Sequence, residues 1–90
     1  MKTNDISPFP ARLKEARLEK RLSQKQLGIL AGIDPFAASA RMNQYERGVH
    51  TADFLTVKRI AEVLQLPTAY FFCEEDELAV NIKTWHKQGK

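Results

Sequence analysis

The sequence predicts an all-helical protein with one domain. Its 90 residues leave room for a single domain, since domains are commonly about 100–150 residues long. Apolar residues recur at the three- and four-residue spacings of amphipathic helices, and no stretch has the alternation typical of a strand. Capping residues, prolines and glycines recur where helices begin and end. These patterns predict five helices and an additional C-terminal helix.

Two helices are predicted at the start of the chain. The prolines on either side of Phe9 suit a first helical turn, and residues 11–21 are rich in strong helix formers. Ser23 is a good N-cap for a second helix over residues 24–31, because Gln26 stands where a capping box requires it. The second helix is expected to bury three apolar side chains, those of Leu27, Leu30 and Ala31.

A third helix is predicted over about residues 35–46. Gly32 suits the positive φ that often follows a helix, Asp34 and Pro35 form an N-cap and first-turn pair, and Gly48 ends the helix. Two apolar residues share its inner face, Met42 and Tyr45. Four polar residues lean outward: Ser39, Arg41, Asn43 and Gln44. Such a face suits the major groove of DNA, where Arg reads guanine and Asn or Gln reads adenine. A polar surface helix without a ligand is the alternative.

Three more helices are predicted in the second half. Asp53 caps a fourth over residues 54–65, and Pro67 begins a short fifth that ends at Phe72. The fourth is expected to turn five side chains inward: Leu55, Val57, Ile60, Ala61 and Leu64. A sixth, over about residues 75–87, has an acidic first turn and late lysines, as the helix macrodipole favours.

Charge is distributed unevenly along the chain. The formal net charge is +3, and residues 1–51 hold nine of the 14 Lys and Arg residues but only five of the 11 acidic residues. A basic excess in the first half is expected if that half faces phosphates. A generally solvated charged surface is the alternative.

Other classes of function find little support. A lone cysteine, Cys73, predicts no internal disulfide, and the lack of a signal-peptide pattern or long apolar run predicts a cytoplasmic protein without membrane contact. No further ligand is spaced for a metal site around His50 or His86. No nucleophile–base arrangement or phosphate loop can be identified, so neither an enzyme nor a cofactor is expected.

Several motifs follow one another after Leu22. They are LSQKQLGILAGI over residues 22–33, QYERG over residues 44–48, and then the spacings of Leu55, Ile60, Ala61, Leu64, Leu66, Pro67, Thr68 and Phe72. Over roughly residues 11–72 they resemble the phage-repressor/Cro-type, or XRE, family of helix-turn-helix proteins. We expect an N-terminal arm (1–8), a five-helix repressor-like helix-turn-helix domain (9–73), and an additional C-terminal helix and tail (74–90).

The resemblance implies a sequence-specific, double-stranded DNA-binding transcriptional regulator, with a repressor favoured, that uses residues 35–46 in the major groove. It places base contacts on Ser39, Ala40, Arg41 and Gln44, with Asn43 nearby, and phosphate contacts on Gln24, Arg47 and His50. Lys25 joins the phosphate set because it opens the second helix beside Gln24.

The resemblance also implies two structural contacts. Gln24 is expected to brace the third helix, and Arg17 to pair with Glu46. An Arg on an otherwise apolar helix face needs a carboxylate partner, which supports the pair. Two separate surface charges are the alternative.

One departure concerns the turn before the third helix. The family usually has about four fewer residues between Gly32 and Glu46, and the extra ones here fall within residues 33–38. Since four residues make about one helical turn, we expect a longer first turn of the third helix. Its alanines could approach the bases or pack against the second helix.

The C-terminal helix carries Leu78, Ile82 and Trp85 at i, i+4 and i+7 spacing. They could cover the core, above the aromatic run of residues 70–72, or form a dimer contact, and the sequence leaves both open. A homodimer on an inverted repeat is expected, because one recognition helix covers few base pairs. The alternatives are a DNA-binding antitoxin whose C-terminal helix binds a protein partner, and a protein-interaction module that has lost DNA binding.

Overall fold

The computed structural model describes residues 6–88, and side chains as far as residue 86. The helices are α1 (Phe9–Glu19), α2 (Gln24–Leu30), α3 (Pro35–Arg47), α4 (Phe54–Leu64), α5 (Thr68–Phe71) and α6 (Asp76–Gln88). No strand occurs within residues 6–88, so the all-α prediction of five helices and an additional C-terminal helix is confirmed. Residues 1–5 of the expected arm, residues 89–90 of the tail and the side chain of the late Lys87 lie outside the described part.

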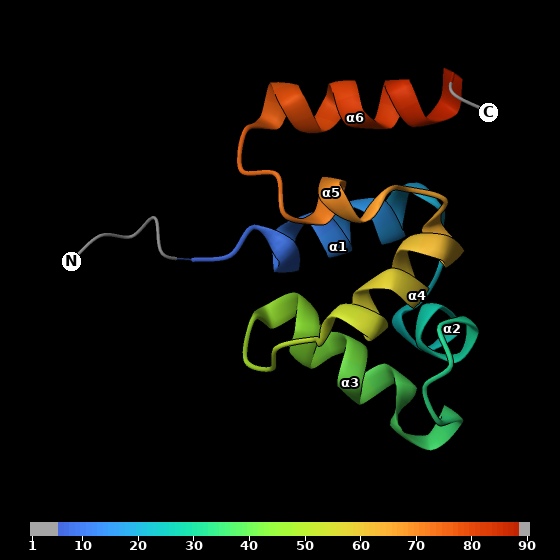
Figure 1. Cartoon of the computed structure of the whole chain (residues 1–90). Coiled ribbons are helices and arrows are strands. Elements are labelled where there is room, and N and C mark those ends of the chain that lie inside the picture. Colours follow the sequence, from blue (N-terminus) through green and yellow to red (C-terminus); the bar gives the residue numbers. More distant parts are fainter. Residues whose placement is uncertain (1–5, 89–90) are drawn as a thin grey trace.

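The helices are arranged around one core (Figure 1). Helices α2, α3 and α4 gather at one end of the molecule, and α6 lies across the opposite end beside α5 and α1. The chain therefore separates the predicted recognition helix from the C-terminal helix by the thickness of the core.

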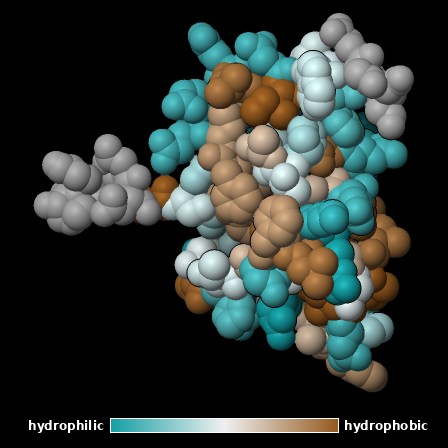
Figure 2. Space-filling model, viewed as in Figure 1, coloured by the Kyte–Doolittle hydropathy of each residue, from teal (hydrophilic) through white to brown (hydrophobic). Residues whose placement is uncertain are grey.

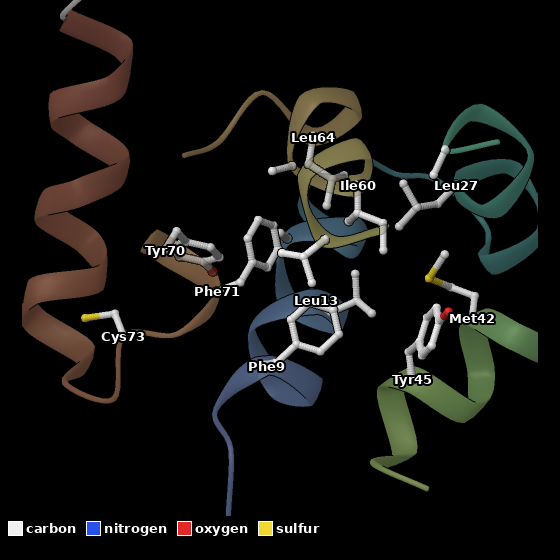
Figure 3. Packing of buried hydrophobic residues seen from close by; sticks show 14 of the residues in the cluster. Phe9, Leu13, Leu27, Met42, Tyr45, Ile60, Leu64, Tyr70, Phe71 and Cys73 are labelled. Carbon is white, nitrogen blue, oxygen red and sulfur yellow. The ribbon is translucent and has the colours of Figure 1, made fainter. Parts of the chain in front are cut away.

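The core is built from side chains of all six helices. Figure 3 shows its large members converging from α1, α2, α3, α4 and α5. Phe9 lies at the centre of an aromatic group, with its ring centroid 5.9 Å from that of Phe71 and 6.5 Å from that of Tyr45. Cys73 is buried as the expected small filler. Burial of these apolar groups is the main stabilising term of such a small domain.

Local capping signals place most helix ends where the sequence predicts them. Ser23 forms the complete capping box, since its Oγ accepts from the Gln26 N–H at 2.9 Å and its own N–H donates to Gln26 Oε1 at 2.8 Å. Gly32 and Gly48 have φ values of 93° and 75°, a region that only glycine enters at little cost.

Asp53 also caps its helix as expected. Its carboxylate accepts from the Thr56 N–H at 2.9 Å. Hydrogen bonds from the side chain and backbone of Thr56 lower the pKa of the Asp53 carboxyl.

Several expectations are wrong in detail. Asp34 occupies the N-cap position of α3, but its side chain makes no capping hydrogen bond, so Pro35 alone supports this start. Leu30 and Leu55 are 61% and 52% exposed. Leu55 precedes the buried Val57 by two residues, which is about 200° around a helix, so it faces the opposite side from the core.

Helix α6 is attached chiefly through one edge. Of its side chains that the structure describes, only Ala79 is fully buried, while Ile82 packs partly against the core. Arg12 links α1 to the start of α6, donating to the Cys73 carbonyl at 2.9 Å and to Asp76 at 3.1 Å. Lys83 pairs with Glu19 at 2.7 Å. These contacts hold α6 beside α1 and α5.

The predicted stripe on α6 is split by this attachment. Ile82 turns toward the core, whereas Leu78 and Trp85 are 49% and 64% exposed. In the aromatic run, Tyr70 and Phe71 are buried, but Phe72 is half exposed and stacks on Phe9. Figure 2 shows exposed apolar side chains in separate patches on the visible face, over the first half of α6 and beside α2.

Candidate nucleic-acid interface

Helices α2 and α3 form the expected helix-turn-helix pair and touch backbone to backbone. Gly28 of α2 faces Ala38 of α3 so closely that a Cβ on Gly28 would lie 2.8 Å from the Ala38 Cβ. Ala38 is fully buried by this approach. The glycine is therefore required for the packing of the two helices, which fixes the first half of α3 on the domain.

Of residues 33–38, where the extra residues fall, 35–38 form the first turn of α3, as the sequence predicts. Helix α3 begins at Pro35 and runs for 13 residues. The turn that leads into it is closed by the Ile33 N–H, which donates to the Gly28 carbonyl at 2.9 Å. The alanines at the start of α3 were expected either to approach the bases or to pack against α2. Ala38 packs against α2, while Ala40 is exposed.

A buried ion pair holds the second half of α3. Arg17 donates from Nε to Glu46 at 2.5 Å and from Nη2 at 3.1 Å, and its third nitrogen donates to the Leu22 carbonyl at 2.9 Å. The two side chains are only 10% and 4% exposed. A bidentate pair in which all three guanidinium nitrogens make hydrogen bonds is the geometry in which a buried charge is tolerated.

Gln24 connects the start of α2 to this pair. Its amide nitrogen donates to Asn43 Oδ1 at 3.3 Å and to Glu46 Oε1 at 3.1 Å. Since an amide carries two N–H bonds, both are used within the protein. This geometry favours the bracing role of Gln24 over a phosphate contact made by its side chain.

The candidate base-contacting residues fall on the outer side of α3. Ser39, Ala40 and Gln44 are exposed, while Asn43 is half-buried where it accepts from Gln24. Arg41 is also half-buried and lies on the flank of the exposed face, three residues before Gln44. The Arg41 side chain would therefore have to extend around the helix to contact a base in the major groove.

The candidate phosphate-contacting residues surround that face. Lys25 at the start of α2, Arg47 at the end of α3 and His50 in the following loop are all exposed. The His50 ring lies 6.0 Å from that of Tyr45, which keeps the loop close to the end of α3.

One exposed residue of α3 was not predicted to take part in the interface. Phe36 is 99% exposed. It precedes Ser39 and Ala40 by three and four residues, so helical spacing alone could have placed it on the same face.

The structure bears on two further features within residues 6–88, a metal site and a membrane-spanning helix. No three His, Cys, Asp or Glu side chains gather there as a metal site. Within that same range, no helix combines the length and apolar character needed to cross a bilayer.

Comparison with known proteins gives a match among solved structures. No protein-family model matches the chain, and no curated protein does. A solved structure, "Crystal structure of transcriptional regulator BswR", is 52% identical and covers 87% of this chain and 77% of its own, with a TM-score of 0.83. The chain belongs to the same protein family as BswR. The all-helical fold predicted from the sequence is thus shared with a transcriptional regulator of the same family.

Proposed function

We propose that this BswR relative is a sequence-specific, double-stranded DNA-binding transcriptional regulator of the XRE type that inserts α3 into the major groove. The observation that carries the proposal is the exposed polar face of α3, held at both ends by the Gly28–Ala38 contact and the Arg17–Glu46 pair. Base readout requires side chains held in a fixed register, and these contacts supply it.

The residues divide into two groups by chemistry. Ser39, Ala40 and Gln44 contact base edges, with Asn43 supporting them and Arg41 reaching in from the flank. Gln reads adenine, Arg reads guanine, and the Ala40 methyl suits the methyl group of thymine. Three further residues, Lys25, Arg47 and His50, contact phosphates on either side of the groove, while Gln24 keeps α2 and α3 in register.

The test compares a base contact with a phosphate contact. A duplex selected from a random library and a scrambled duplex are titrated with protein over a salt series. Arg41→Ala should lose about 1–3 kcal/mol on the selected duplex and little on the scrambled one. Lys25→Ala should weaken both alike and reduce the slope of log affinity against log salt by about one.

Lys14→Ala, which removes an exposed charge on α1, is the matched control for Lys25→Ala. Equal losses for Arg41→Ala on both duplexes would reassign Arg41 to a phosphate. Failure of the wild-type protein to bind any duplex in a salt-dependent manner would contradict the function itself.

The regulator acts as a two-fold homodimer that represses by occupying an inverted repeat. Two α3 helices about one helical turn apart, roughly 34–36 Å, would read half-sites whose centres are about 10 base pairs apart. The exposed Leu78 and Trp85 side chains on α6 form the candidate self-complementary contact, while Ile82 is already engaged with the core.

The dimer is tested by the stoichiometry and footprint of the bound complex. Trp85→Ala should shift binding from two subunits toward one and shorten the protected region, with Val80→Ala as an exposed control on the same helix. Protection of a single asymmetric half-site by one wild-type subunit at full affinity would contradict the dimer. A dimer that survives Trp85→Ala would move the contact away from α6 and leave that surface for another protein.

A further inference from the structure

Phe36 is the most exposed large apolar side chain of the described residues, at 99%. A single exposed apolar residue is common on protein surfaces and by itself indicates nothing. Its position is more informative, because it occupies the first turn of α3, within the extra residues that lengthen this helix.

Helical geometry aligns Phe36 with the candidate DNA-contacting face. Counting from Phe36 in steps of three, four, seven and eleven residues reaches Ser39, Ala40, Asn43 and Arg47, which therefore share one stripe along α3. The opposite stripe is the buried one, formed by Ala38, Met42 and Tyr45. Phe36 therefore extends the exposed stripe by one turn toward the helix N-terminus, about 4.5–6 Å beyond Ser39 and Ala40.

The turn that carries Phe36 is held firmly. Ala38, two residues on, is packed against Gly28, and the Ala37 N–H donates to the Asp34 carbonyl at 2.9 Å. No residue of the described part covers the Phe36 ring, which is 99% exposed, so the helix fixes the direction of the Cα–Cβ bond and leaves the ring accessible to a ligand.

The N-terminal residues of a recognition helix are the ones that approach base edges in the major groove. The apolar group available there is the C5-methyl of a pyrimidine, which thymine carries. We propose that Phe36 packs on such a methyl group and makes the protein prefer thymine at one position of each half-site, next to the position met by Ala40. This inference rests on the proposed DNA-binding function. It adds an apolar base contact to the hydrogen bonds proposed for the polar side chains of α3.

The experiment removes the methyl group and the ring separately. In the selected duplex each thymine is replaced in turn by uracil, which lacks only the C5-methyl, and affinities are measured for wild type and Phe36→Ala. At one position of each half-site uracil should lower wild-type affinity about fourfold, the factor expected for one buried methyl group. The same replacement should have no effect on Phe36→Ala, which itself should bind the thymine duplex roughly 3- to 10-fold more weakly than wild type.

Two further arms make the assignment specific. Cytosine and 5-methylcytosine at the same position separate the methyl contact from the base pair, and tighter binding of thymine than of 5-methylcytosine identifies thymine as the natural source. Leu18→Ala, an exposed apolar truncation on α1, should bind all duplexes as wild type does. Because the ring is uncovered, the melting temperature of Phe36→Ala should equal that of wild type.

Three results would overturn the inference while leaving DNA binding intact. They are wild-type affinity for Phe36→Ala, a uracil effect at every position that persists unchanged in Phe36→Ala, and a change of oligomeric state in Phe36→Ala without DNA, which would make the ring a protein contact. Absence of salt-dependent duplex binding by the wild type would instead overturn the proposed function, and the thymine contact with it.

Discussion

Helices α3 and α6 are each 13 residues long but are attached to the domain in different ways. Helix α3 buries Ala38, Met42 and Tyr45 and is held by an ion pair that is almost fully desolvated. Helix α6 buries Ala79 among its described side chains, and its ion pairs involve Asp76, which is 94% exposed, and Glu19, which is 51% exposed.

The difference shows how a small domain can hold one surface in fixed register and attach another loosely. Desolvated contacts have a large effect when broken, because the remaining partner is left buried without compensation. Exposed ion pairs contribute little, because water and salt screen them. The helix proposed to read DNA is held by a pair of the first kind. Both ion pairs of the helix proposed to meet a second subunit have an exposed carboxylate, although the Arg12 side chain of one pair is only 10% exposed.

The largest expected effect comes from breaking the buried pair. Glu46→Ala leaves the Arg17 guanidinium buried without its carboxylate and removes an acceptor of Gln24. The free energy of unfolding should fall by about 3–5 kcal/mol, measured by urea denaturation. Glu62→Ala, an exposed carboxylate on α4, should stay close to wild type. If Glu46→Ala lowers the free energy of unfolding by less than 1 kcal/mol, the Arg17–Glu46 pair stabilises the fold no more than the exposed ion pairs of α6 do.

A smaller effect is expected at the close approach of α2 and α3. Gly28→Ala inserts a methyl group 2.8 Å from the Ala38 Cβ and should destabilise the fold by about 1–3 kcal/mol, despite the higher helix propensity of alanine. In an Ala38→Gly background the same substitution should be less harmful, since part of the clash is removed. A double-mutant cycle measures this coupling. Equal losses in both backgrounds would show that the two positions do not constrain each other.

Loss of a surface contact on α6 should be smaller still. Lys83→Ala removes the pair with Glu19 and should reduce the free energy of unfolding by about 0–1 kcal/mol, less at high salt. The measurement is the unfolding midpoint at low and high ionic strength, with Lys58→Ala on α4 as the exposed control. A loss above 2 kcal/mol that salt does not reduce would show that α6 is held as firmly as α3.

The last prediction concerns the ionisation of Tyr70, which changes the free energy of unfolding only at alkaline pH. Burial raises the pKa of Tyr70 well above 10.0, and the Glu15 carboxylate that accepts from its hydroxyl at 3.1 Å raises it further. A raised folded-state pKa of an acid contributes stability that is present below the unfolded pKa and lost as pH rises above it. Unfolding free energy should therefore decline above about pH 10, and less so in Tyr70→Phe.

Absorbance of the phenolate gives an independent check on Tyr70. The folded protein should retain a protonated tyrosine at a pH where the urea-unfolded chain is largely ionised, and Tyr70→Phe should lose that difference. Identical titration of the folded and unfolded chains would contradict the effect of burial on this group.

The amino-acid sequence by itself determined the helices and most of their ends. Ser23, Gly32, Gly48 and Asp53 act through hydrogen bonds or φ angles within a few residues of themselves, so their effect can be predicted without knowing the rest of the fold. The burial of Met42 and Tyr45 follows from helical periodicity in the same way. The Arg17–Glu46 pair came from a family resemblance and could not have been derived from spacing, because 29 residues separate the partners.

The tertiary structure alone decided which helix faces remain uncovered. Leu30 and Leu55 are apolar yet exposed, and Ile82 turns to the core while Trp85 does not. Both bonds of the Gln24 amide and the free ring of Phe36 depend on how α2 and α3 approach each other. Periodicity states which residues share a face, but whether a neighbouring helix covers that face depends on packing between segments far apart in the chain, which no local pattern contains.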